Sequence, residues 1–151
     1  MPAVLTESSS LPGRDVATRN CLVTSSLGVK LSCGRLSRDT YSAEYCALRG
    51  RRVPLRWLPA EAVLRDQVTS RADCWAWAVL CWEVLRRAEL PHPALSDEQL
   101  ARAGPPVPPV PAEAPPQLAA AMRRCWTPAV ADRPDMAHVL DMLAGSPDSG
   151  P

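Results

Sequence analysis

The run from Ala72 to Leu85 constrains the fold more than any other part of this sequence, because it is apolar almost all the way round. Ser70, followed by Asp73 three residues later, has the spacing of a capping box that starts a helix. A helix without a polar face has to be covered on every side, so it belongs in the middle of a domain. The sequence therefore predicts a central buried helix.

Shorter helical patterns follow this run. Ser96 with Gln99 repeats the capping-box spacing and predicts a short helix that ends near Ala103. Apolar residues at helical spacing predict two more helices, at 117–126 and 136–143. The chain should therefore be mostly helical.

Little sequence remains for strands. Alternating apolar residues between 20 and 31, around a Ser-Ser-Leu-Gly turn, predict one short hairpin. The polar stretch 33–50 is expected to be a long loop. The expected fold class is mainly α with a short β-hairpin.

The domain boundaries follow from the same pattern. Prolines in 104–116 remove backbone donors and favour a polyproline II path, so this stretch is expected to be a stiff connector. We expect one domain at 13–143, between disordered tails at 1–12 and 144–151.

Charge and cysteine content exclude several classes of function. The chain has 16 arginines and a single lysine against 16 acidic residues, and its net charge is only +1, so no nucleic-acid or membrane surface is indicated. Six scattered cysteines form no Cys-x-x-Cys pair, so neither a zinc site nor a disulfide framework is expected. The most apolar segment, 74–82, is about half the length of about 20 residues that a bilayer requires. With no secretion signal in 1–13, a cytoplasmic location is expected.

Five short motifs occur in the order and at roughly the spacing found in the C-terminal lobe of tyrosine kinases. They are Arg14-Asp15-Val-Ala-Thr-Arg-Asn20, Val53-Pro-Leu-Arg-Trp57, Pro59-Ala-Glu61, Ala72-Asp-Cys-Trp-Ala-Trp77, and Cys125-Trp126 with Asp132-Arg-Pro134. The resemblance covers about residues 13–143, and the family's N-terminal lobe has no counterpart. Asp39-Thr-Tyr-Ser-Ala-Glu-Tyr45 and Pro91-His92 resemble stretches of the colon carcinoma kinase family of inactive receptor tyrosine kinases.

This resemblance implies a degenerate catalytic site. Asp15 would stand at the position of the base, with Arg19 in the same loop and Asn20 at a metal-ligand position, while Gly13 replaces the family's histidine. Cys33 replaces the aspartate that grips magnesium, and a thiol is a poor ligand for that ion. We therefore expect a pseudokinase with no cofactor, no bound metal and no ATP.

Other resemblances concern structure and regulation. Glu61 and Arg133 match the family's buried ion pair, and Asp73 matches the residue that anchors the catalytic loop. Tyr41 and Tyr45 fall in the activation-loop region and are candidate phosphorylation sites, where phosphate could pair with Arg14 or Arg38.

Three functions remain open. The first is a non-catalytic module that binds protein partners, which the resemblance places in Wnt, planar-polarity and cell-adhesion signalling, on the cytosolic side of a single-pass receptor. The second is a fragment of an active tyrosine kinase. The third is a ligand of Src-homology-3 domains, because Arg102, Pro105 and Pro108 have the spacing that these domains accept.

Overall fold

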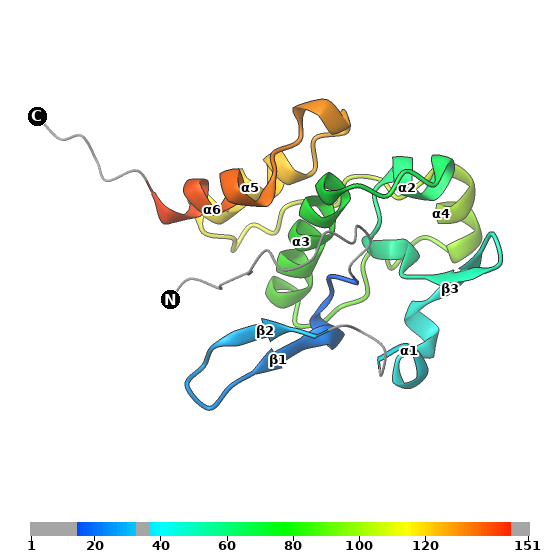
Figure 1. Ribbon diagram of the computed structural model, residues 1–151, viewed down its shortest axis with the longest axis horizontal. Helices are drawn as coiled ribbons and strands as arrows, with labels where there is room; N and C mark the ends of the chain where they lie inside the picture. The colour runs from blue at the N-terminus through cyan, green and yellow to red at the C-terminus, as the bar shows by residue number, and fades with distance from the viewer. Residues whose placement is uncertain (1–14, 33–36, 146–151) are drawn as a thin grey trace, which may run out of the picture.

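The computed structural model describes residues 15–32 and 37–145 and is mainly helical, as the sequence predicts (Figure 1). The α-helices are α1 (Ser37–Thr40), α2 (Ala60–Arg65), α3 (Ser70–Leu85), α4 (Asp97–Ala103), α5 (Pro116–Cys125) and α6 (Met136–Ala144). The 3-10 turns are η1 (Thr18–Asn20), η2 (Ser42–Glu44), η3 (Leu55–Trp57) and η4 (Val130–Asp132). The strands are β1 (Cys21–Val23), β2 (Val29–Leu31), β3 (Cys46–Leu48) and β4 (Arg51–Val53).

Helix α3 is the centre of the fold, which confirms the prediction from its apolar run. It crosses the middle of the molecule, with α5 and α6 on one side and α2 and α4 on the other (Figure 1). The main core gathers around it and includes Trp57, Trp75, Trp82 and Trp126, each at most 6% exposed. Burial of such large aromatic surfaces stabilises a domain of this size more than its short helices do by themselves.

The start of α3 differs from the predicted capping box. The N-cap residue is Thr69, Ser70 is already the first helical residue, and no side chain caps the helix. By contrast, the capping box of Ser96 and Gln99 is present at the start of α4. The α3 start is set by burial of its first turn rather than by a cap, since Ala72 is almost fully buried.

The structure contains the predicted hairpin and a second one that the sequence reading missed. Strands β1 and β2 pair antiparallel, with Leu22 opposite Lys30. Strands β3 and β4 also pair antiparallel, inside and just after the stretch expected to be a long loop. The second turn is Arg49-Gly50, and both residues have positive φ, as a two-residue hairpin turn requires.

The proline-rich stretch is packed onto the domain rather than free of it. Gly104 ends α4 with φ 78°, and a Cβ there would lie 2.7 Å from the Cβ of Ala60 on α2. Beyond it, Pro105, Pro108 and Pro111 are buried at intervals of three. This is the period of a polyproline II helix, so one of its edges faces the core.

No helix in residues 15–32 and 37–145 is long and apolar enough to cross a membrane.

Candidate functional site

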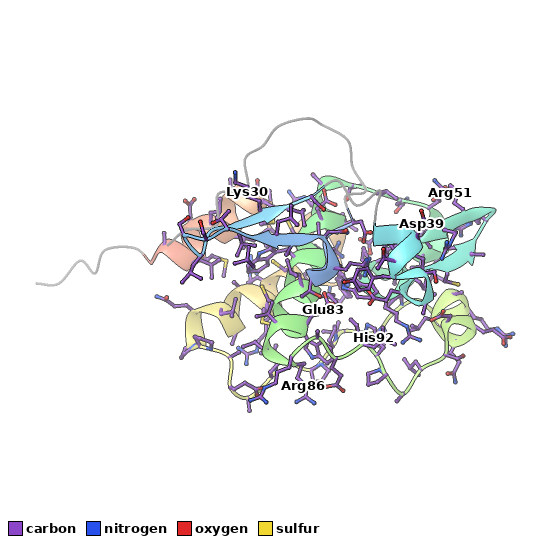
Figure 2. All side chains as sticks on the ribbon, turned by 90° about the horizontal axis from the view of Figure 1, so that it is seen from below. Lys30, Asp39, Arg51, Glu83, Arg86 and His92 are labelled. Carbon is purple, nitrogen blue, oxygen red and sulfur yellow. The ribbon has the colours of Figure 1, made fainter. Side chains whose placement is uncertain are left out.

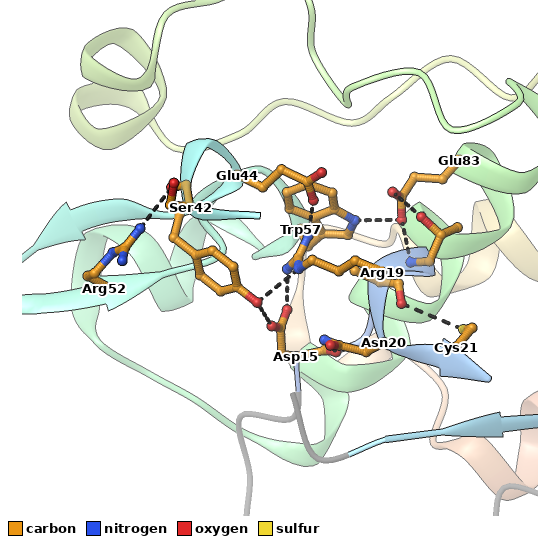
Figure 3. Close-up of polar contacts among 12 residues, drawn as sticks. Asp15, Arg19, Asn20, Cys21, Ser42, Glu44, Arg52, Trp57 and Glu83 are labelled. Carbon is orange, nitrogen blue, oxygen red and sulfur yellow. Dashed lines mark hydrogen bonds and ion pairs between the residues drawn. The ribbon is translucent and has the colours of Figure 1, made fainter. Parts of the chain in front are cut away.

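The kinase-like loop lies at one end of α3 and folds as the turn η1 (Figure 3). The amide of Asn20 donates to the carbonyl oxygen of Asp15 over 2.7 Å and so closes the loop. The Asp15 carboxylate is engaged on both oxygens: the Arg19 guanidinium pairs with one, and the Tyr45 hydroxyl donates to the other. The side chain of Asp15 is only 8% exposed.

Arg19 is the hub of this cluster. Besides Asp15, it pairs with Glu44 over 2.6 Å, and its Nε donates to the Tyr45 hydroxyl over 2.9 Å. Its guanidinium lies 4.6 Å from the ring centre of Tyr45 and 4.2 Å from that of Trp57. Burial lowers the pKa of Arg19, but the carboxylate of Asp15 and the hydrogen bonds that Arg19 donates to Tyr45 and Glu44 outweigh it and raise the pKa above its usual value. The Arg19 side chain therefore stays positively charged although it is buried.

Glu83 connects the loop to α3, and sequence reasoning gave it no role. Its carboxylate accepts from Trp57 Nε1 over 2.7 Å, from the Thr18 hydroxyl over 2.8 Å and from the Thr18 backbone over 3.1 Å. It is 4% exposed, and burial raises the pKa of its carboxyl. The available signal was an acid in the middle of the apolar residues that follow Asp73, because such a group must find donors when it is buried.

The expected ion pair of Glu61 and Arg133 is present, with 2.7 Å between Oε1 and NH1. Arg133 is fully buried and also donates to the carbonyls of Thr127 and Arg71, each over 3.1 Å. It therefore ties α2, the start of α3 and the segment before η4 together. Asp73 lies partly buried on α3 and takes part in an interaction of its own, while its expected anchoring of the catalytic loop stays a prediction.

The two candidate phosphorylation sites have opposite environments. Tyr41 is 43% exposed. Tyr45 is 6% exposed, and its hydroxyl is bonded to both Asp15 and Arg19 in this conformation. Phosphorylation of either tyrosine stays a prediction. Arg14 and the Arg38 side chain, the expected phosphate partners, lie outside the described residues.

The candidate ligand motif for Src-homology-3 domains is only partly accessible. Arg102 is exposed and pairs with Glu98 on its own helix. Pro105 and Pro108, the two prolines that such a groove would contact, are buried against the domain. The folded lobe therefore does not present this motif, because packing has turned its proline edge inward.

The residues described here do not form a magnesium site. Asn20 is 1% exposed, and its side-chain amide nitrogen donates to the carbonyl of Asp15. Cys33, like Gly13, lies outside the described residues, but its thiol is the wrong donor for a hard cation. Across 15–32 and 37–145, no group of three or more His, Cys, Asp or Glu side chains could hold a metal.

A central apolar helix, a closed Asp–Arg–Asn loop and a buried Glu–Arg pair together define the C-terminal lobe of a protein kinase. Residues 5–143 match the family described as protein tyrosine and serine/threonine kinase, and the chain belongs to that family.

Among its relatives are proteins called inactive tyrosine-protein kinase 7. The chain is 40% identical to that of Gallus gallus and 39% identical to that of Mus musculus, each over 137 residues, or 89% of this chain. A protein of Drosophila persimilis called tyrosine-protein kinase-like otk is 36% identical over 135 residues, or 87% of this chain. The chain spans about 13% of the length of each of these relatives. The predicted resemblance to a receptor tyrosine pseudokinase is confirmed at this level.

Proposed function

We propose that this chain is a non-catalytic interaction module, the C-terminal lobe of a tyrosine pseudokinase. The observation that carries the proposal is the closed state of Asp15. A catalytic base has to reach the hydroxyl proton of its substrate, and both oxygens of this carboxylate are held by Arg19 and Tyr45. Without a base that can reach a substrate, the folded lobe can still bind protein partners through its outer surface.

Two further observations support the proposal. Cys33 offers sulfur where a kinase of this type has a magnesium-binding carboxylate. Relatives of this chain are called inactive. By the same resemblance, the parent protein is a single-pass receptor with this lobe in the cytoplasm, and it acts in Wnt, planar-polarity and cell-adhesion signalling.

The competing function is phosphotransfer by an intact parent kinase, because Asp15 and Asn20 keep the family's residue types. Thermal unfolding of the purified chain with magnesium and ATP tests binding. A functional site at a hundredfold excess of ligand over its Kd would raise the free energy of unfolding by about 2.7 kcal/mol, and we expect no shift.

The intact parent should likewise transfer no phosphate to a tyrosine peptide. An Asp15→Asn variant is the matched control, and it should behave as the wild type does. Tyrosine phosphate that the intact parent makes and Asp15→Asn abolishes would establish the competing function instead.

A further inference from the structure

Residues 86–96 form the α3–α4 loop, and Figure 2 shows Arg86 and His92 along it. Three residues of this loop other than glycine have a left-handed backbone: Arg87, Ala88 and His92, with φ of 54°, 63° and 54°. Residues with a side chain disfavour this conformation, so it persists only where other contacts hold the chain in place. The closed form of the loop therefore depends on what binds it to the rest of the domain.

Arg56, on η3, binds this loop to the domain. Its guanidinium donates to the carbonyl oxygens of Pro91, His92 and Leu95 over 2.9 Å, 2.8 Å and 2.9 Å. It also pairs with Asp97, the first residue of α4, over 2.8 Å. Arg56 is 8% exposed, and hydrogen bonds in such a poorly solvated place are stronger than those in water. One side chain thus holds three carbonyls of the loop and the start of α4.

His92 is the residue of the loop whose charge can oppose this binding. Its side chain is partly buried, and its Nε2 atom is buried with no hydrogen-bond partner among the described residues. Burial lowers the pKa of His92 to about 4, and the positive charge of Arg56 acts in the same direction. The ring is therefore neutral at pH 7. A proton on it would add a second positive charge beside Arg56 in a place that solvates charge poorly.

Two other ionisable groups lie around the Arg56 guanidinium. The carboxylate of Asp97, on α4, is paired with Arg56 itself. The thiol of Cys46, on β3, lies within the electrostatic influence of both, and burial raises its pKa, so it stays neutral. Neither group therefore supplies a carboxylate of its own to a protonated His92.

We propose that His92 makes the α3–α4 loop an acid-sensitive switch: the loop is bound to Arg56 while His92 is neutral and is released when His92 takes up a proton. In the released loop the ring lies in water, where a histidine has a pKa near 6.5. The released form binds the proton more tightly than the bound form does, so acid shifts the equilibrium toward release. The effect is absent above the ordinary histidine range and grows as the pH falls from there toward 4.

Hydrogen exchange at the Leu95 amide measures release, because this amide donates to the His92 carbonyl within the loop over 3.0 Å. The experiment uses the 151-residue chain and corrects for the ordinary pH dependence of amide exchange. The protection factor of Leu95 should fall about thirtyfold between about pH 7.5 and about pH 5.0, the ratio that a pKa near 6.5 in the released loop and about 4 in the bound loop gives.

Two variants assign the effect to one ring. His92→Gln keeps a polar side chain that does not titrate, so its Leu95 protection should be independent of pH over this range. His138→Gln removes the other histidine of the chain, which is exposed on α6, and should leave the thirtyfold fall unchanged. Both variants keep every other titrating group of the chain.

Two measurements on the unchanged chain complete the test. The Trp126 amide, which donates to the Met122 carbonyl over 3.0 Å, reports opening of the whole lobe and should exchange more slowly than Leu95 at every pH. The ring signals of His92 should titrate at a clearly lower pH than those of His138. The proposal is overturned if Leu95 exchanges in step with Trp126, if His92→Gln keeps the pH dependence, or if the two rings titrate together.

Discussion

Tyr45 donates its hydroxyl hydrogen to the carboxylate of Asp15, 30 residues earlier in the chain. The same hydroxyl accepts from Arg19. The segment that carries the two candidate phosphorylation sites therefore closes over the loop of Asp15 and Arg19 (Figure 3).

Tyr45→Phe should destabilise the lobe without creating activity. Removing the hydroxyl leaves an oxygen of Asp15 without one of its donors in a nearly closed environment, at a cost of about 1–3 kcal/mol. Urea unfolding measures the change. Tyr41→Phe, at an exposed position, should change stability by less than about 0.5 kcal/mol. Equal effects of the two substitutions would show that the Tyr45 contact does not hold the loop.

Arg133→Ala should unfold or aggregate the lobe. Glu61 would remain nearly buried without its partner, and three segments would lose their common donor, so we expect a loss of about 3–5 kcal/mol. Arg102→Ala is the control, because its pair with Glu98 is exposed on both sides and should contribute under about 1 kcal/mol. A soluble Arg133→Ala protein with an unchanged melting curve would contradict the buried pair's role.

Glu83 should make stability depend on pH. Burial raises the pKa of its carboxyl above the usual 4.5, and the hydrogen bonds from Trp57 and Thr18 offset this only in part. The folded state then binds the proton more tightly than the unfolded state does. The contribution of Glu83 to the free energy of unfolding therefore falls as the pH rises from the unfolded carboxyl range through the raised pKa.

Glu83→Gln lacks this ionisation and serves as the comparison. Urea unfolding of both proteins between about pH 4 and about pH 7 should show the stability difference moving in favour of the variant as the pH rises. A difference that stays constant over this range would mean that Glu83 titrates normally.

Three thiols with raised pKa values should resist alkylation: those of Cys74 and Cys125, which are buried, and that of Cys81, which is partly buried. Burial raises the pKa of Cys74 to about 11 and that of Cys81 to about 12, and it also raises the pKa of Cys125. Because the thiolate is the reactive form, iodoacetamide at neutral pH should leave these three unmodified until urea unfolds the chain. Peptide mass spectrometry follows each site, with partly exposed Cys46 as the internal reference. Early alkylation of Cys74 would show that α3 opens readily.

A free peptide of residues 100–112 and the folded chain should differ toward Src-homology-3 domains. Any domain that binds the peptide through Pro105 and Pro108 should fail to bind the folded chain, because both prolines are buried there. Fluorescence titration of a domain panel against both forms tests this. Equal affinities would mean that the 104–116 stretch leaves the domain surface freely.

Local sequence determined most of the helices and one hairpin. The capping box of α4 acts through contacts between near neighbours, and the apolar run of α3 has to be buried whatever covers it, so their residue types suffice to predict both helices. The hairpin at Arg49-Gly50 was missed because each of its strands has only three residues, too few to show an alternating pattern. The structure identifies it by the strand pairing and by the positive φ of both turn residues. Motif order gave the kinase-like lobe and the Glu61–Arg133 pair through resemblance.

Only the tertiary structure decided what surrounds Asp15 and which prolines face solvent. Tyr45, Trp57 and Glu83 lie far from Asp15 in the sequence, and nothing in their spacing states that they meet around Arg19 and Thr18. The burial of Pro105 and Pro108 could not be predicted either. Their ligand motif is complete in the sequence, but both prolines pack against the domain. The local sequence states which side chains a segment carries. The accessibility of those side chains depends on the other elements that pack against the segment.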